Sequence, residues 1–193
     1  MAYEIIVVGT SWGGLAALRE LIVGLPAGFA LPLVLVAHRH RDSGQLLTSL
    51  LQDATPLAVC DAEDKAPITS GIHLAPADYH LLVEEGFFSL STDEPVAFSR
   101  PSIDVTFGSA ADAYGARVAG VVLTGANADG ARGLRRVADR GGLALVQRPS
   151  TAESSAMPAS ALAAVPEARA MTIPEIAGAL AGLRPSRTGG ALR

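Results

Sequence analysis

The chain lacks the features of a disulfide-rich, membrane-spanning or nucleic-acid-binding protein. A single cysteine, Cys60, among 193 residues excludes a disulfide framework and a cysteine-ligated zinc site. Fifteen basic residues stand against 19 acidic ones, so the basic excess of a nucleic-acid-binding domain is missing. No apolar run approaches the roughly 20 residues that span a bilayer. The short apolar run at residues 5–8 has no basic segment before it, unlike a signal peptide. We therefore expect a cytoplasmic protein.

The composition is that of a compact domain. Hydrophobic residues make up 49% of the sequence and charged residues 18%, which excludes global disorder. The length fits one domain. We expect it to span residues 1–184, with a C-terminal tail at 185–193.

Short apolar segments alternate with helical patterns along most of the chain. Mainly apolar runs predict buried strands at residues 3–8, 33–37, 118–123 and 143–147. Apolar residues at helical spacing predict helices at 14–23, 44–51, 105–114, 131–140, 155–164 and 174–183. Apolar strands separated by helices are typical of a parallel sheet covered on both faces. The sequence therefore predicts a doubly wound, Rossmann-like α/β fold with three layers and a mainly parallel sheet.

The middle of the chain follows a different pattern. Four short strand candidates, at 57–60, 71–75, 80–84 and 87–90, are separated by turn residues. The turn Glu84-Glu85-Gly86 indicates a hairpin. We expect a β-rich insertion or an antiparallel edge here, with a small antiparallel hairpin.

Chemistry-bearing residues follow three of the apolar strands. In open α/β sheets the site lies beyond the carboxyl ends of the strands. Ser11 follows the first strand, His38 the second, and Asp129 the strand at 118–123. These are the residue types of a nucleophile, a general base and an orienting carboxylate.

The glycine-rich turn after the first strand has two interpretations. Gly9-x-Ser11-x-Gly13, between a strand and a helix, fits a nucleophile elbow. Such a turn also cradles phosphates. A dinucleotide site expects an acidic residue after the second strand, where this chain has His38, and no lysine marks a P-loop. A nucleotide-binding oxidoreductase stays open as an alternative, as does a non-catalytic signalling adaptor.

Other residues compete for the histidine and aspartate positions. His40 lies two residues past the second strand, while His73 and His80 fall in strand candidates, where structural roles are expected. Asp104 lies at the start of a predicted helix, where carboxylates commonly cap. Asp129 also precedes a helix, so spacing alone leaves Asp104 and Asp129 as equal candidates.

Five motifs in order resemble the catalytic domain of the chemotaxis protein-glutamate methylesterase, CheB, over about residues 3–183. They are Val8-Gly9-Thr10-Ser11-Trp12-Gly13-Gly14, Ala37-His38, Leu74-Ala75-Pro76-Ala77-Asp78-Tyr79-His80, Arg100-Pro101-Ser102-Ile103-Asp104 and Leu123-Thr124-Gly125-Ala126-Asn127-Ala128-Asp129-Gly130-Ala131. The resemblance implies a serine hydrolase whose nucleophile, histidine and aspartate fall on Ser11, His38 and Asp129. It thereby favours Asp129 over Asp104.

The resemblance also implies a substrate. Members of this family remove methyl esters from glutamate side chains on the cytoplasmic helices of chemoreceptors and release methanol, and many also deamidate receptor glutamines. No metal or cofactor is expected.

The backbone amides of Trp12 and Ala126 are the candidates for an oxyanion hole. By position alone, Arg39, Arg41, Tyr79 and Arg100 are candidates for a substrate groove.

The chain departs from the family pattern near the expected cleft. Trp12 stands where a small residue is common, Ala37 where glutamine is, Ala126 where methionine is, and Asn127 replaces a glycine. These changes leave open a methylated protein other than a chemoreceptor, or a different ester. Most members carry an N-terminal receiver domain, and because the first strand begins near residue 3 we expect none here.

Overall fold

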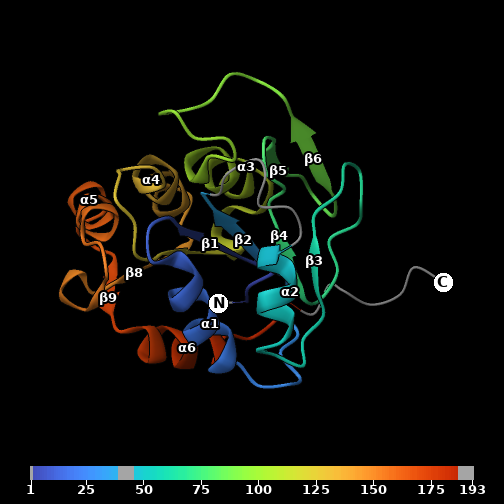
Figure 1. Ribbon diagram of the computed structural model, residues 1–193, viewed down its shortest axis with the longest axis horizontal. Helices are drawn as coiled ribbons and strands as arrows, with labels where there is room; N and C mark the ends of the chain where they lie inside the picture. Colours follow the sequence, from blue (N-terminus) through green and yellow to red (C-terminus); the bar gives the residue numbers. More distant parts are fainter. Residues whose placement is uncertain (1, 39–45, 187–193) are drawn as a thin grey trace.

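The computed structural model describes residues 2–38 and 46–186, which form three layers around a parallel sheet (Figure 1). The sheet order is β3-β4-β2-β1-β7-β8-β9, and every neighbouring pair is parallel. The strands are β1 (Ile5–Thr10), β2 (Leu33–Ala37), β3 (Val59–Asp61), β4 (Ile72–Leu74), β7 (Val118–Val122), β8 (Leu143–Gln147) and β9 (Arg169–Met171).

Different elements cover the two faces of the sheet (Figure 1). One face packs against α1 (Gly14–Val23), α2 (Leu46–Gln52) and α6 (Ile173–Ala181). The other packs against α3 (Ile103–Tyr114), α4 (Ala131–Asp139), α5 (Ala156–Ala164) and the antiparallel hairpin β5 (His80–Val83) and β6 (Phe88–Ser91).

The double covering explains why the central strands are apolar along most of their length. In β1, Ile5 and Val7 enter the cluster under α3, while Ile6 and Val8 enter the cluster under α1. All four are fully buried. Because successive side chains of a strand point to opposite faces, a central strand with two covered faces needs apolar residues at every position. Burying each such side chain contributes roughly 1.5–3 kcal/mol.

The predicted fold class is confirmed, and the middle of the chain needs one correction. The hairpin β5–β6 is antiparallel, as expected. The segments 57–60 and 71–75, which we assigned to the same insertion, instead supply β3 and β4, which extend the parallel sheet. These strands have three residues each, too few for their pattern to reveal the pairing partner. β9 is also three residues long, with its first two exposed, and was missed.

The two ends of the described chain lie together. Tyr3 forms a parallel bridge with Pro185, and the Ser186 amide donates to the Tyr3 carbonyl at 2.8 Å. Of the expected tail at 185–193, residues 187–193 lie outside the described residues, so the boundary at 184/185 stays a prediction. Within 2–38 and 46–186, none of the helices has the length and apolarity to span a bilayer.

Strand order places the site. β1 lies at the centre of the sheet between β2 and β7. The chain passes from β1 to β2 on one side and later returns to β7 on the other side. Such a reversal opens a crevice at the carboxyl ends of the strands. The loops after β1 and β7, and His38 directly after β2, lie at this crevice.

Candidate active site

The first loop leads from β1 into α1 and carries Ser11. Gly13, the N-cap residue of α1, has a φ of 77°, and a side chain there would collide with Glu153, because its Cβ would lie 2.8 Å from the Glu153 Cβ. Glycine therefore meets both constraints on this turn. The strand–turn–helix order is as expected for a nucleophile elbow, but the left-handed residue is Gly13 and not Ser11.

The loop after β7 is fastened to this turn by Thr124. The Thr124 carbonyl accepts hydrogen bonds from the Ser11 amide at 2.9 Å and from Thr10 Oγ1 at 2.8 Å. Thr124 Oγ1 donates to the Trp12 carbonyl at 2.9 Å. These bonds hold the backbone around Ser11 in fixed register with the loop that carries Asp129.

His38 joins the serine to the aspartate. Its Nδ1 lies 3.2 Å from Ser11 Oγ, and its Nε2 lies 2.7 Å from Asp129 Oδ2. Because a carboxylate can only accept, Nε2 carries the ring proton and Nδ1 offers its lone pair to the serine hydroxyl. The ring therefore presents Nδ1 to the serine, the reverse of the chymotrypsin arrangement.

The Asp129 carboxylate is buried and surrounded by donors. Its side chain is 0% exposed. Besides His38, it accepts from the Ile103 amide at 2.7 Å, the Asp104 amide at 2.9 Å and Ser102 Oγ at 2.9 Å. Burial by itself raises the pKa of this carboxyl, but the hydrogen bonds from His38 and the two amides outweigh it and hold the pKa below its usual value. Asp129 is therefore ionised at neutral pH.

Asp104 makes the reciprocal contacts, at the start of α4. Its Oδ1 accepts from the amides of Gly130 and Gly133 at the start of α4, at 2.9 and 2.7 Å. Its Oδ2 accepts from Arg132 Nε at 2.9 Å. Asp129, just before α4, caps α3, and Asp104, in the first turn of α3, caps α4. Of the two carboxylates that spacing left equal, the structure places Asp129 beside His38.

The remaining histidines are bound elsewhere. His73 Nε2 donates to the Thr69 carbonyl at 2.8 Å. His80 Nδ1 accepts from the Ser102 amide at 3.2 Å, and its Nε2 donates to the Glu94 carbonyl at 3.1 Å. Both rings are buried, as expected for structural histidines. His40 lies outside the described residues.

A cavity of about 700 Å³ opens beside the serine, with mainly apolar walls. Trp12, whose residue is 67% exposed, and Leu15 contribute from the start of α1. Leu46, Leu47 and Leu50 contribute from α2. The other lining residues are Ser11, Gly13, Gly14, Ala16, Arg19, Ala37, His38 and Glu153. The hydroxyl and the imidazole are therefore accessible from an apolar groove between α1 and α2.

Sequence reasoning missed two walls of this cavity. Leu46, Leu47 and Leu50 carried no signal, because apolar residues on a short helix are typical of the core. Glu153 follows β8, so applying the strand-end rule to that strand as well would have found it.

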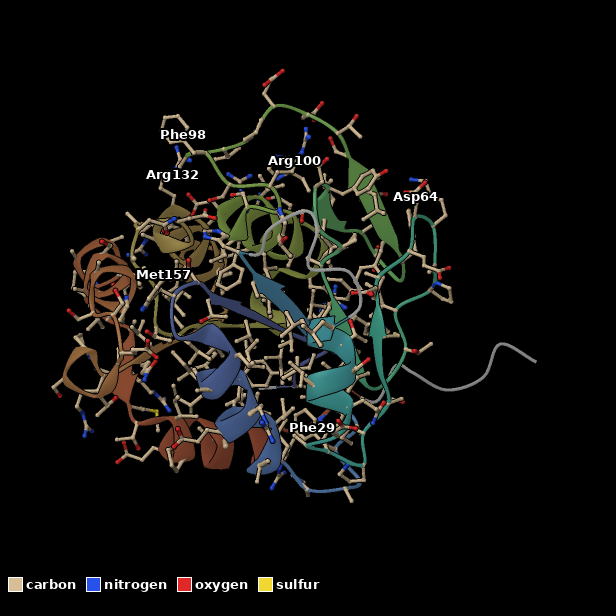
Figure 2. All side chains as sticks on the ribbon, in the orientation of Figure 1. Phe29, Asp64, Phe98, Arg100, Arg132 and Met157 are labelled. Atoms are coloured by element: carbon tan, nitrogen blue, oxygen red, sulfur yellow. The ribbon has the colours of Figure 1, made fainter. Side chains whose placement is uncertain are left out.

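Of the four expected groove residues, the two that the structure describes do not line this cavity. Arg39 and Arg41 lie outside the described residues. Tyr79 is exposed, but neither it nor Arg100 is among the described residues that line the cavity. Arg100, in the loop between β6 and α3 (Figure 2), pairs with Asp78 at 2.6 Å and donates to the carbonyls of Thr92 and Asp93.

The expected oxyanion-hole amides have no acceptor within the described part of the chain. The Trp12 amide lies between the bonded amides of Ser11 and Gly14 at the start of α1. The Ala126 amide follows Gly125, whose own amide donates to the Ser154 carbonyl at 3.1 Å. Across residues 2–38 and 46–186, no cluster of three histidine, cysteine or acidic side chains could hold a metal ion.

Comparison with known proteins identifies the family. The sequence model of the CheB methylesterase family matches residues 6–180. A protein from Leptospira interrogans, provisionally named a protein-glutamate methylesterase/protein-glutamine glutaminase, is 43% identical over 179 residues, which are 92% of this chain and 93% of that protein. A protein-glutamate methylesterase/protein-glutamine glutaminase from Anaeromyxobacter dehalogenans is 37% identical over 92% of this chain, but the match spans 52% of that longer protein.

The fold agrees with a solved member of this family. The crystal structure of the Thermotoga maritima CheB methylesterase catalytic domain superposes with a TM-score of 0.88 at 30% identity. The match covers 94% of this chain and 98% of that domain. The family match over most of the chain, the relatives and the shared fold agree, and this chain belongs to the CheB methylesterase family.

Proposed function

We propose that this protein is a serine hydrolase that removes methyl esters from glutamate side chains of a chemoreceptor or a similar methylated protein and releases methanol. The observation that carries the proposal is the hydrogen-bonded chain from Ser11 through His38 to Asp129, with its hydroxyl end open to a cavity. Family membership gives the substrate class. We place the reaction in the cytoplasm, where the receptor helices lie.

The acylation step follows from the positions of the three side chains. Ser11 Oγ attacks the ester carbonyl carbon while its proton passes to His38 Nδ1. Asp129 stabilises the imidazolium and keeps the other ring proton on Nε2. The carbonyl oxygen becomes an oxyanion, which accepts from the backbone amides of Trp12 and Ala126. The intermediate then expels the methoxy group, which takes the proton from Nδ1 and leaves as methanol.

Hydrolysis of the acyl-enzyme reverses these roles. Nδ1 takes a proton from water, and the resulting hydroxide attacks the acyl carbon. Ser11 leaves with the proton from Nδ1, and the product is a glutamate γ-carboxylic acid, which gives its proton to the solvent and leaves as the γ-carboxylate. The same sequence with a glutamine substrate releases ammonia, and we propose deamidation as a second activity because the relatives carry it in their names.

We further propose that the substrate helix lies along the apolar groove. Trp12, Leu15 and Leu50 offer apolar contact next to the nucleophile, while Arg19 and Glu153 supply one charge of each sign. Arg39, Arg41, Tyr79 and Arg100 remain candidates for contacts further along the helix. Alanine variants of these four that left demethylation unchanged would remove them from the substrate footprint.

The test is methanol release from membranes that contain methylated receptors, with wild type beside Ser11→Ala. Removing the serine of such a triad costs on the order of 10⁴–10⁶ in kcat. Ser160→Ala is the matched control, because this partly exposed hydroxyl on α5 donates to the Ala156 carbonyl one turn earlier and is not among the described residues that line the cavity. A Ser11→Ala enzyme within tenfold of wild type would rule out Ser11 as the nucleophile.

No release from folded wild-type protein would contradict the methylesterase proposal and favour a different ester or an adaptor role. Titration with NAD(H) and NADP(H) tests the remaining alternative, because an oxidoreductase would bind one of them and the proposed hydrolase would bind neither.

A further inference from the structure

Asn127 contacts the reacting histidine but has no role in the mechanism above. Its Nδ2 lies 3.4 Å from His38 Nδ1, the same nitrogen that faces Ser11 Oγ at 3.2 Å. Its Oδ1 accepts the Asp129 amide at 3.1 Å, in a turn closed by the asparagine side chain. This bond fixes the orientation of the amide, so its NH₂ group faces the imidazole.

The contact with the histidine is long, and it competes with the serine. His38 Nδ1 has one lone pair, because Nε2 carries the ring proton toward Asp129. The serine hydroxyl and the Asn127 NH₂ group both approach this lone pair. Among the described residues, Asn127 Nδ2 has no other acceptor. In the resting enzyme, one donor of the asparagine is therefore held only weakly beside the nucleophile.

The reaction changes the partner of this donor. When Ser11 attacks, its proton moves to Nδ1, and the protonated ring can no longer accept a hydrogen bond. At the same moment, negative charge develops on the carbonyl oxygen of the substrate. The Asn127 NH₂ group therefore loses its acceptor on His38 just as the substrate oxyanion forms. A hydrogen bond from this group to the oxyanion would exist in the transition state and not in the ground state, and such a bond raises kcat.

We propose that the Asn127 side chain is a third oxyanion-hole donor in this enzyme, beside the backbone amides of Trp12 and Ala126. Asn127 directly follows Ala126, so the side-chain amide and the backbone amide belong to one loop, and the Asn127 amide lies beside His38, which lines the cavity. The proposal rests on the methylesterase function proposed above. It also gives a chemical reason for asparagine at a position where a glycine offers no side-chain donor.

Two variants of Asn127 distinguish a role as an oxyanion donor from a role in closing the turn. Asn127→Ala removes both the donor and the oxygen that accepts the Asp129 amide. Asn127→Ser keeps an oxygen that can close the same turn, but its shorter side chain leaves no N–H beside Nδ1. If Asn127 acts only through the turn, Asn127→Ser retains near wild-type activity. If it donates to the oxyanion, both variants lose activity.

The measurement is kcat and KM for methanol release from methylated receptor membranes, with thermal unfolding recorded for each variant. Loss of one oxyanion-hole donor typically lowers kcat by about 10²–10³. We expect a fall of this order in both variants, with KM within about threefold of wild type and with Asn127→Ser unfolding at the wild-type temperature.

Three results would overturn the proposal. They are Asn127→Ser with a kcat within threefold of wild type, a loss confined to KM, and variants faster than wild type, which would make Asn127 a brake on His38. Each of these requires an active wild-type enzyme. Absence of methanol release by wild type is a different result, which removes the methylesterase function and this donor role together.

Discussion

Asp129 and Asp104 lie near the starts of two neighbouring helices, yet of the two only Asp129 contacts His38. Each lies within two residues of a helix start and accepts two backbone amides from the other helix. Asp129 also accepts from His38, and Asp104 from Arg132. Both carboxylates accept two backbone amides, and they differ in the side chains that the tertiary structure places beside them: His38 and Ser102 beside Asp129, and Arg132 beside Asp104.

Burial separates the two pairs. The Asp129 side chain is fully buried, and the His38 side chain is 14% exposed and lines the cavity. The Asp104 side chain is 10% exposed, and Arg132 is 76% exposed at the surface of α4 (Figure 2). A charge interaction is strong where water is excluded and weak where it is not. The first pair can therefore orient a ring for catalysis, while the second serves mainly to join two helices.

Asp129→Asn should have the largest effect. The amide can donate to Nε2, which would favour the ring tautomer with its proton on Nδ1 and remove the base that faces Ser11. The corresponding change in a serine protease triad lowers kcat by about 10⁴, and we expect a similar loss in methanol release. A kcat within tenfold of wild type would show that Asp129 is a helix cap and no more.

Ser102→Ala should have an intermediate effect. Ser102 Oγ donates to Asp129 and also accepts from the Val105 amide at 3.5 Å as the N-cap of α3. Because a hydrogen bond to a charged group contributes about 1.5–3 kcal/mol, its loss should lower kcat by roughly 10- to 100-fold with little change in KM.

Thr172→Ala is the matched control for Ser102→Ala. Thr172 is also an N-cap hydroxyl, in the capping box of α6, and the residues of α6 do not line the cavity. Both substitutions should lower the free energy of unfolding by about 1 kcal/mol. Equal kcat values for the two variants would show that Ser102 acts on stability alone.

Asp104→Asn should affect stability more than activity. Asparagine keeps an oxygen that can accept the two amides at the start of α4 but loses the negative charge there, which contributes about 0.3–2 kcal/mol to the free energy of unfolding. We expect this loss in urea denaturation, with kcat within tenfold of wild type. A fall in kcat larger than that of Asp129→Asn would assign the orienting role to Asp104 instead.

Arg132→Ala should have the smallest effect. An ion pair with one exposed partner contributes about 0–1 kcal/mol and weakens as salt rises. Urea denaturation at low and high salt should show a small loss that shrinks at high salt, with unchanged methanol release. A loss comparable to that of Asp104→Asn would mean that the arginine, and not the two backbone amides, is the main partner of Asp104.

The helix and strand pattern was predictable because it depends on local sequence. Mainly apolar runs located β1, β2, β7 and β8 to within two residues, and helical spacing located α1 with the bounds observed. The strands of three residues were not predictable in the same way. β3, β4 and β9 are defined by their pairing partners, and three residues carry too little periodicity to name a partner.

The fold class, the family and the positions of Ser11, His38 and Asp129 after three strands could be predicted from the sequence, because apolar runs and motifs are local. Which carboxylate faces His38, and which side chains surround Ser11, depends on the tertiary structure. The distances from His38 to the two carboxylates, and from Ser11 to its neighbours, depend on the packing of α3 against α4 and on the register of three strands. The spacing of residues along the chain cannot reveal that Asp129 caps α3 while Asp104 caps α4. Each of these four hydrogen bonds joins residues at least 25 positions apart.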